Sequence, residues 1–583
     1  MCCWSARCQP LPQDVELRLE LGDAYYRTGH LDEALMQVRW LQANSDVLKP
    51  YQQLALVRLL QNTGQEALAR TRAQWLLQRY PDDLDVVLYA ARQERSNGEY
   101  AKALTLFQRA YQIALADGNT ATDTATGTIT DTLRLQLAYN LAESGIGTGI
   151  GTDETRIASD GPDAATLALR FMGAMESTAD AAGAVGTLEK IQADVDAIED
   201  RRQAWVELGL EQRERVASEG RSTLHGWEQP LVVVLPWRYD GRVFLHLDQV
   251  ALDAGSLPDD VREFGQLAAW SVEAVPGASP TPIPIPQTAR GLNLGIGYEG
   301  DSLRWDLGSV GQGFPVSNIV GGIRQSGDIG ALGYSLELAR RPMTGTLLSY
   351  AGARDPVTGA VWGGVVATSV GGRISADVGA FGLSASTSFA VLNGRNVDDN
   401  QRFTWRLALD RDLYRSTAQQ VNLGVSVSGA QFARDLSGFT WGHGGYYSPK
   451  SSTTLTLPLE WNGRHKAWSW LLRASVSASR SDSHAADYFP GNALLQSQAQ
   501  SLVSDPVYSG GGGPLSTGYS LRSVLEYQAS ARWTLGARLE REVSDYYTPL
   551  NLLFYTRYLF DPVRGPRGLQ NDGVRPVRAY SSF

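Results

Sequence analysis

Charged residues recur at alternate positions through the C-terminal half of the chain, between apolar neighbours. In one such run Leu303, Trp305 and Leu307 share one parity, whereas Arg304 and Asp306 share the other. Successive residues of a β-strand face opposite sides, so each run has an apolar face and a polar face. If the apolar faces contact lipid, the polar faces line a pore, and the predicted pore-lining residues are Arg304, Asp306, Glu337, Arg406, Asp410, Glu460, Arg473, Arg522, Glu526, Arg532, Arg538, Glu540 and Arg557.

The signs of these residues indicate the kind of cargo such a pore would carry. Seven are basic and six are acidic, so the predicted lining is close to balanced. A duct for a polyanion needs a lining of mainly positive sign, because charges in a low-dielectric tube concentrate or repel charged cargo. The balance favours a neutral polymer. The alternative is that these residues form cross-strand ion pairs that brace the wall.

No residue pattern in the chain indicates catalysis. The histidines His30, His225, His246, His443, His465 and His484 form no set with a nucleophile or with metal-ligand spacing. All three cysteines lie within the first eight residues, which excludes a disulfide framework. We therefore predict a protein that is not an enzyme and needs no cofactor or metal. The net charge of -10 argues against a nucleic-acid partner.

The alternating pattern extends from Arg290 to Phe560. No run of eighteen apolar residues occurs anywhere in the chain, which argues against a helical membrane span. About 270 residues at roughly 17 per strand and turn correspond to sixteen strands, an even number within the range of bacterial outer-membrane barrels. We predict a transmembrane β-barrel over residues 289–560 with a water-filled lumen.

The N-terminal part has a different period. Gly29, Gly64 and Gly98 are 35 and 34 residues apart, close to the 34-residue period of the tetratricopeptide repeat (TPR). The sequence thus predicts TPR helices over residues 11–116, and the fold class is a multidomain α + β protein with an α-solenoid before a sixteen-stranded antiparallel barrel. The repeats could present a protein-binding surface or act as a spacer.

Two connecting regions are predicted between the repeats and the barrel. Residues 117–230 contain Thr/Gly-rich stretches and then a helical periodicity at Leu188, Ile191, Val195 and Ile198, which indicates a linker and a degenerate repeat. Residues 231–288 contain strand-like runs and then five prolines between 276 and 286, which indicates an extended periplasmic linker.

Several segments resemble one family. The stretches Trp441–Pro449, Ser452–Trp461, Leu348–Gly359 and Trp362–Thr368 are similar to the C-terminal region of the bacterial cellulose synthase operon protein C family. The resemblance implies an outer-membrane export channel for a nascent exopolysaccharide, most simply cellulose, with periplasmic TPRs that couple to the synthase complex. The implied partners are a glucan chain, the inner-membrane cellulose synthase complex, other periplasmic proteins, outer-membrane lipid and the barrel assembly machinery.

Within the first of these segments, Tyr446 and Tyr447 are the glycan-contact candidates, although packing within a loop is an open alternative. The first ten residues lack the apolar core of a signal peptide, so we expect a truncated or mis-assigned start. Two other functions stay open: a TPR binding scaffold anchored by a plugged barrel, and an exporter of a different neutral exopolysaccharide.

Residues 561–583 form a Gly/Pro-rich tail that is predicted not to be a strand. Its four arginines outnumber its two aspartates, giving a net charge of +2. We hypothesise that the tail enters the pore mouth as a plug and docks on acidic groups there through Arg564, Arg567, Arg575 and Arg578.

Overall fold

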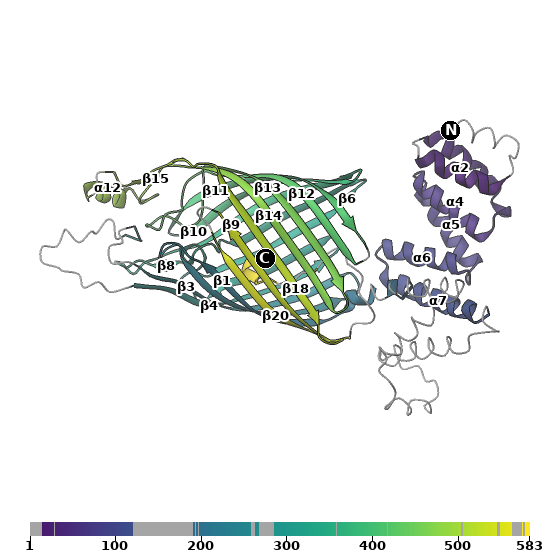
Figure 1. Cartoon of the computed structure of the whole chain (residues 1–583), viewed down its shortest axis with the longest axis horizontal. Helices are drawn as coiled ribbons and strands as arrows, with labels where there is room; N and C mark the ends of the chain where they lie inside the picture. Colours follow the sequence, from purple (N-terminus) through teal and green to yellow (C-terminus); the bar gives the residue numbers. More distant parts are fainter. Residues whose placement is uncertain are drawn as a thin grey trace, which may run out of the picture. The chain divides into compact units, whose positions relative to one another are not determined.

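The computed structural model describes two compact units, Met1–Glu199 and Asp200–Phe583 (Figure 1). The described residues are 14–27, 30–120, 191–192, 194–195, 198–257, 263–266, 285–356, 358–416, 418–502, 505–544, 548–562, 574, 576 and 578–583. In this part of the chain, no helix is long and apolar enough to cross a membrane.

Up to Thr120, the described residues of the first unit form three successive helix pairs. Its helices are α2 (Val15–Arg27), α3 (Leu31–Ala43), α4 (Pro50–Asn62), α5 (Glu66–Arg79), α6 (Leu84–Ser96) and α7 (Tyr100–Thr120), with the 3-10 turn η1 (Ser45–Val47) before α4. Packing occurs within each pair, α2 on α3, α4 on α5 and α6 on α7, and also between successive pairs. This is the arrangement expected of a repeat solenoid.

The period-marking glycines stand where the chain turns between the helices of a pair. Gly64 and Gly98 have φ values of +78° and +80°, a left-handed conformation that glycine adopts without a steric cost. Gly29 lies outside the described residues. Between the helices, Ala34, Ala103, Leu56 and Phe107 are fully buried, so small and large apolar residues together fill the solenoid core.

The second unit is a closed antiparallel β-barrel. The strands of the ring are β1 (Trp205–Arg215), β2 (Leu224–Trp237), β3 (Gly241–Leu257), β4 (Ile285–Gly300), β5 (Leu303–Gln312), β6 (Asn318–Ile329), β7 (Leu332–Pro342), β9 (Val361–Val378), β10 (Phe381–Arg395), β11 (Val397–Arg415), β12 (Gln419–Phe432), β13 (Ser451–His465), β14 (Trp468–Ser483), β18 (Ser516–Gln528), β19 (Trp533–Val543) and β20 (Leu550–Leu559). Pairing of Trp205 with Leu559 joins β1 to β20 and closes the ring.

The predicted number of sixteen strands is confirmed. The main sheet contains eighteen strands, of which two are short additions: β8 (Ala353–Arg354) pairs with β9, and β17 (Gly511–Gly512) pairs with β14. A separate two-stranded sheet is formed by β15 (Ala486–Asp487) and β16 (Val507–Tyr508).

The barrel starts earlier in the chain than the predicted boundary at residue 289. Strands β1 to β3 form a continuous sheet with β20 and β4. The prediction of a linker and degenerate repeat over 117–230, and of a strand-like linker over 231–288, is therefore wrong where these strands lie. The 3-10 turn η3 (Asp200–Arg202) immediately precedes β1. The proline-rich stretch lies mostly outside the described residues, and its last proline, Pro286, is in β4 and pairs with Ser256 of β3.

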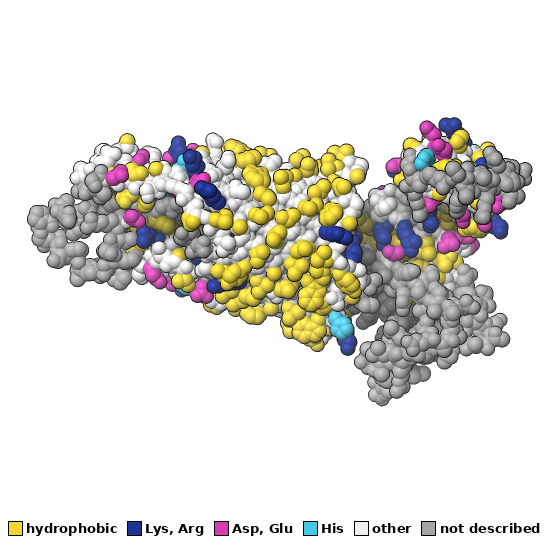
Figure 2. Space-filling view, turned by 45° about the horizontal axis from the view of Figure 1, so that its top comes forward, with side chains coloured by type: hydrophobic (Ala, Val, Ile, Leu, Met, Phe, Trp, Pro, Cys, Tyr) yellow, Lys and Arg dark blue, Asp and Glu magenta, His cyan; other side chains and the backbone are white. Residues whose placement is uncertain are grey.

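The outer face of the barrel is apolar. Leu245, Leu307 and Leu407 expose 45%, 57% and 56% of their surface although they lie in the middle of strands. Hydrophobic side chains cover much of this face, while charged ones gather near the strand ends (Figure 2). Since water would disfavour so large an apolar surface, this is a lipid-facing wall.

The two ends of the barrel differ. At one end, called here the turn end, strands are joined by short hairpins such as Trp237–Gly241 and His465–Trp468. Aromatic pairs of the outer face lie there, with ring centroids 4.7 Å apart for Trp468 and Tyr527 and 4.9 Å apart for Trp533 and Tyr558. Such pairs are typical of the aromatic girdle of membrane barrels.

The opposite end, called the loop end, carries the long connections. These include α11 (Leu347–Ala351) between β7 and β9, and α12 (Ala493–Leu502) between β14 and β18. In Figure 1, α12 and β15 lie at the same end of the barrel as β8.

Candidate functional site

One side of the lumen is a wall of buried ion pairs, here called the charged wall. Arg213 contacts Glu228 at 2.7 Å and Glu211 at 3.4 Å, and Arg538 reaches the same Glu211 at 3.0 Å. Farther along the wall, Arg557 contacts Glu207 at 2.7 Å. These residues belong to β1, β2, β19 and β20, and their cross-strand pairing compensates charges that water no longer solvates.

The charged wall and the neighbouring strands β3 and β5 hold the C-terminal end of the chain. The backbone N–H of Tyr580 donates to the Asp248 carboxylate, and its side-chain hydroxyl donates to Asp306 at 2.9 Å. Next in sequence, the Ser581 hydroxyl donates to Glu228 at 3.0 Å, while Arg213 donates to Ser582 at 3.0 Å. The last residues, in the 3-10 turn η6 (Tyr580–Ser582), therefore lie inside the barrel.

The final residue, Phe583, adds an aromatic contact. Its ring lies 5.2 Å from that of Phe244 and 5.1 Å from that of His246, and the Arg304 guanidinium lies 4.5 Å from the ring centroid. A cation over an aromatic face is attracted by the ring quadrupole. Hydrogen bonds and aromatic packing thus both anchor the C-terminal segment to the wall.

Two glycines make room for this segment. A Cβ added at Gly295 would lie 2.5 Å from the Tyr580 ring, and one at Gly308 would lie equally close to it. Gly295 of β4 and Gly308 of β5 are direct cross-strand partners. The missing side chains on two neighbouring strands therefore form the recess in which the tyrosine ring sits.

The end of the tail lies in the lumen, as the plug hypothesis expects, but the described contacts differ from the predicted ones. Arg564, Arg567 and Arg575 lie outside the described residues, and Arg578 is exposed. Among the described tail residues, the contacts to acidic groups come from Tyr580 and Ser581 rather than from an arginine. A neutral hydroxyl can bond a carboxylate that already has its arginine, as Asp306 does with Arg341 at 2.6 Å.

The helix α11 also folds inward against the barrel wall. Its residue Tyr350 is buried, packs edge-on against Phe314 at 5.3 Å, and accepts a 2.9 Å hydrogen bond from Asn293 of β4. Thr346 caps this helix and donates to the carbonyl of Gly445 at 2.9 Å. The helix and Tyr580 share one apolar cluster with β3 and β4 residues, so the loop end and the C-terminal segment pack together.

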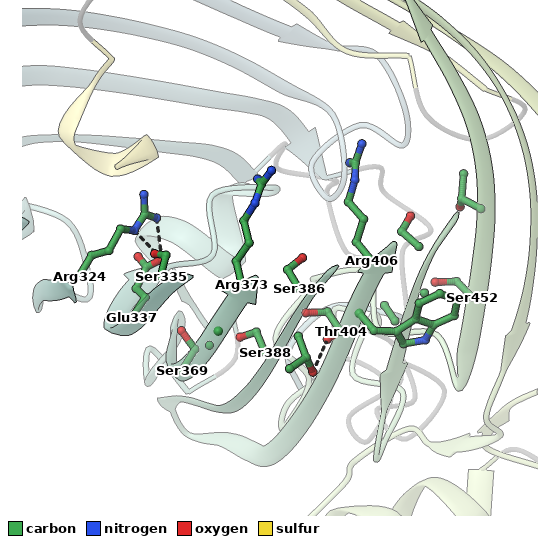
Figure 3. Close-up of a pocket in the computed structure, with 18 residues that line it drawn as sticks. Arg324, Ser335, Glu337, Ser369, Arg373, Ser386, Ser388, Thr404, Arg406 and Ser452 are labelled. Carbon is green, nitrogen blue, oxygen red and sulfur yellow. Dashed lines mark hydrogen bonds and ion pairs between the residues drawn. The ribbon is translucent and has the colours of Figure 1, made fainter. Parts of the chain in front are cut away.

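Across the inner face of β6 to β13 the lining is different, and we call it the hydroxyl wall. It borders a hollow of about 560 Å³ and consists mainly of small hydroxyl and glycine residues with a few charged ones: Arg324, Ser335, Glu337, Ser369, Gly371, Arg373, Ser386, Ser388, Thr404, Arg406, Ser428, Ala430, Ser452 and Thr454. Figure 3 shows Arg373 and Arg406 extending from this wall into the open space, with Ser386 between them. The wall is wide open and rich in hydrogen-bonding groups.

Most of the predicted pore-lining residues lie on the inner face as members of pairs. The pairs are Arg304 with Glu299, Asp306 with Arg341, Glu337 with Arg324, Glu460 with Arg473, Arg522 with Glu540, Arg538 with Glu211, and Arg557 with both Glu207 and Glu526. Asp410 accepts a hydrogen bond from Asn422, and Arg406 has no ion-pair partner among the described residues.

Arg532 departs from the prediction. It precedes β19 in the turn that follows β18, and it donates to the hydroxyl of Tyr558 at 3.3 Å. Tyr558 packs on Trp533, which is 46% exposed on the outer face, so Arg532 belongs to the girdle and not to the lumen. The alternation along β19 does not predict the position of Arg532, because this residue lies just before the strand.

Tyr446 is also not where a glycan could reach it. It is buried in the loop-end cluster with Trp362 and Phe432, and its hydroxyl accepts a 3.1 Å hydrogen bond from Asn400. Burial raises the pKa of Tyr446, in keeping with this apolar setting. Tyr447 points the other way and is 65% exposed. Loop packing, the alternative interpretation, is therefore the role of Tyr446.

The same loop buries His443. Its Nε2 lies 3.0 Å from the carbonyl of Asp487, and the ring meets Tyr508 edge-on at 5.2 Å. Burial lowers the pKa of His443. Within the described part of the chain, no group of three His, Cys, Asp or Glu side chains is placed to hold a metal ion.

Sequence reasoning missed the residues that hold the tail. Asp248 and Glu228 lie in strands assigned to a linker, and Tyr580 and Phe583 carry no periodic signal. Gly295 and Gly308 alternate with apolar residues in their runs and are the one local sign that something approaches the wall closely.

Comparison with known proteins agrees with this architecture. Residues 222–561, more than half of the chain, match the family model described as cellulose synthase operon protein C C-terminus. The cellulose synthase operon protein C of Salmonella typhimurium is 34% identical over 344 residues, which are 58% of this chain and 28% of that protein. The Pseudomonas fluorescens protein of the same name is 29% identical over 394 residues, 67% of this chain and 29% of its own length.

The matched part of the chain spans less than a third of these curated relatives. Among solved structures, a bacterial polysaccharide outer membrane secretin aligns with 62% of this chain and 99% of its own, at 12% identity and a TM-score of 0.38. A match this loose supports no functional comparison.

Proposed function

Because the chain belongs to the cellulose synthase operon protein C family, we propose that it exports a neutral exopolysaccharide, cellulose in the simplest case, through the lumen of its barrel. The observation that carries the proposal is the hydroxyl wall, an open lane of small polar side chains facing a wall whose charges are paired.

The chemistry of the hydroxyl wall suits a glucan. Ser386, Ser388 and Thr404 each offer a donor and acceptors at the surface of the hollow. A glucan chain carries hydroxyls along its whole length, so it can exchange hydrogen bonds with successive wall residues as it moves. Contacts that are individually weak and repeated allow a polymer to enter and also to leave.

The barrel's surface supports an outer-membrane location. Closed barrels span membranes because every backbone group is paired, and this one has a lipid-facing apolar wall with aromatic pairs at one end. Outer-membrane barrels have short periplasmic turns and longer external loops, so the turn end would face the periplasm. The chain passes from η3 into β1 at that end.

The repeats would then act in the periplasm. Their helix pairs form a solenoid with its own core, which is suited to binding the inner-membrane synthase complex or other periplasmic proteins. Assembly of the barrel would need the barrel assembly machinery and outer-membrane lipid. We assign no catalytic step to the chain.

Flux of a defined oligosaccharide tests the proposal. Liposomes that contain the full chain and are loaded with cellohexaose should release it faster than protein-free liposomes with the same load. Truncation after Arg578 should increase the rate. The variant Ser386→Phe with Ser428→Phe fills the lane and should block release. Ala385→Phe is the matched control, because Ala385 pairs with the exposed Leu407 on the lipid face. Unchanged release by the lane variant would contradict the proposed path.

A second candidate is a binding scaffold whose barrel is only an anchor. The docked C-terminal segment favours it, since Tyr580 and Phe583 occupy part of the lumen. The same experiment separates the two: a scaffold would release no cellohexaose, either as the full chain or after truncation at Arg578.

A further inference from the structure

Two arginines of the hydroxyl wall differ from the paired cations of the lumen. Arg373 and Arg406 are exposed to the hollow, and neither has a hydrogen bond or ion pair with any described residue. Elsewhere on the inner face, Arg324 holds Glu337 at 2.6 Å and Arg557 holds Glu207 at 2.7 Å. Arg373 and Arg406 therefore place two unpaired positive charges on the hydroxyl wall.

The strand register sets the two residues side by side. Arg373 of β9 is the direct partner of Ser386 of β10, which is in turn the partner of Arg406 of β11. Strands lie about 4.8 Å apart, so the two backbones are about 10 Å from one another with a serine between them. The same row continues through Ser335 on one side and Ser428 on the other.

Nearby acids do not cancel this charge. The carboxylate of Glu337 is engaged by Arg324. Asp377 and Asp410 lie four residues farther along the strands of Arg373 and Arg406, a distance of about 13 Å at 3.3 Å per residue. That exceeds the screening length of about 8 Å at physiological salt. The hollow around the two arginines is therefore positive.

We propose that Arg373 and Arg406 form a subsite for anionic groups, carboxylates or phosphate esters, carried on the exported glucan; this inference rests on the proposed export function. A guanidinium presents a planar fork of donors that matches the two oxygens of a carboxylate or phosphate. The flanking serines bind sugar hydroxyls, so the row recognises a sugar chain and its charged substituent together.

Exposure keeps the subsite weak enough for transport. Exposed ion pairs typically contribute about 0.2–1 kcal/mol each. Two of them correspond to about a tenfold preference for an anionic over a neutral chain, since 1.4 kcal/mol is a factor of ten. A preference of this size holds a substituent briefly without trapping the polymer.

Calorimetric titration of the detergent-solubilised full chain at low ionic strength tests the subsite. Carboxymethyl cellohexaose should bind about tenfold more tightly than cellohexaose. The variant Arg373→Gln with Arg406→Gln should bind both oligosaccharides equally. The control variant Arg324→Gln with Glu337→Gln removes a paired cation and its anion on the same wall, and it should keep the preference.

Other outcomes overturn the inference. Equal binding of both oligosaccharides by the unmodified chain, or a preference that survives Arg373→Gln with Arg406→Gln, would remove the subsite while leaving export of a neutral chain intact. Glucuronate binding as tightly as carboxymethyl cellohexaose would show a general anion site instead. Absence of cellohexaose binding would count against the proposed function itself.

Discussion

The hydroxyl of Tyr580 donates a 2.9 Å hydrogen bond to Asp306, a residue 274 positions earlier in the chain. Asp306 also accepts both Nη donors of Arg341 at 2.6 Å. One carboxylate thus joins β5, β7 and the C-terminal segment in the lumen.

Replacing Tyr580 by Phe should loosen the C-terminal segment. The change removes a donor to a buried carboxylate while keeping the ring, at a cost of about 1–3 kcal/mol. We expect open-channel events in planar bilayers to become about tenfold more frequent or more. Tyr447→Phe, at an exposed residue of the loop end, is the control and should leave the currents unchanged.

Adding one methyl group at Gly295 should displace the C-terminal segment by a steric clash on the side of the barrel wall. In Gly295→Ala the new Cβ would lie 2.5 Å from the Tyr580 ring, which has to move. The expected result is a higher single-channel conductance with barrel stability nearly unchanged. Gly372→Ala is the matched control, because its Cβ has only ordinary contacts, the nearest 3.5 Å away. Equal currents in both variants would show that the ring does not limit the pore.

The ion pairs of the charged wall should matter for stability. Arg557→Met leaves the carboxylates of Glu207 and Glu526 without their arginine, at a cost of about 3–5 kcal/mol. The temperature at which the folded band is lost in heat-modifiability gels should fall. Adding Glu207→Gln should restore part of the loss, because one uncompensated charge is removed; no recovery would argue against a charge-based cause.

The sequence was informative where side chains alternate strictly. In a run such as Leu455, Leu457 and Leu459, one face of the strand contacts lipid and the other faces the lumen. These leucines expose 41–48% of their surface on the outer wall. The count of sixteen strands was right, but the estimate used a shorter span than the true Trp205–Leu559. The inner positions of β1 carry charges whose partners lie on β2, β19 and β20. The alternation of residues within β1 could therefore not assign this strand to the barrel.

Long-range contacts were beyond the sequence. The predicted balance of charge treats each residue alone, whereas pairing by register decides which charges stay free, as for Arg373 and Arg406. The recess for Tyr580 needs β4, β5 and the chain end together. No periodicity reports such a contact between segments hundreds of residues apart.

The early strands lead to a prediction about fragments. Residues 200–583 contain every strand of the ring and should refold in detergent as a heat-modifiable barrel without the repeats, because the repeats form a separate unit with their own core. Residues 290–560 lack β1 to β3 and should not close, since β20 loses the partner that joins it to the rest of the sheet. Heat-modifiable folding of the shorter fragment would contradict this requirement.

Acidification should loosen the loop end through His443. Its buried ring contacts the Asp487 carbonyl through Nε2, and Nδ1 has no hydrogen-bond partner among the described residues, so a second ring proton would lack an acceptor. Burial lowers the pKa of His443, outweighing the opposite influence of Asp487, Asp435 and Asp398. The unfolded loop therefore binds a proton more readily, with an ordinary histidine pKa of about 6.5.

It follows that the stability contributed by neutral His443 is present above about pH 6.5 and is lost as the pH falls below that value. Amide protection factors for residues 436–448, corrected for intrinsic exchange, should fall between pH 7.5 and 5. The fall should be about tenfold for each pH unit by which burial lowers the pKa of His443. His443→Gln can still donate to Asp487 but cannot titrate, so it should flatten this dependence. His465→Gln, at an exposed histidine of the turn end, should not. A pH dependence that persists in His443→Gln would assign the effect to another group.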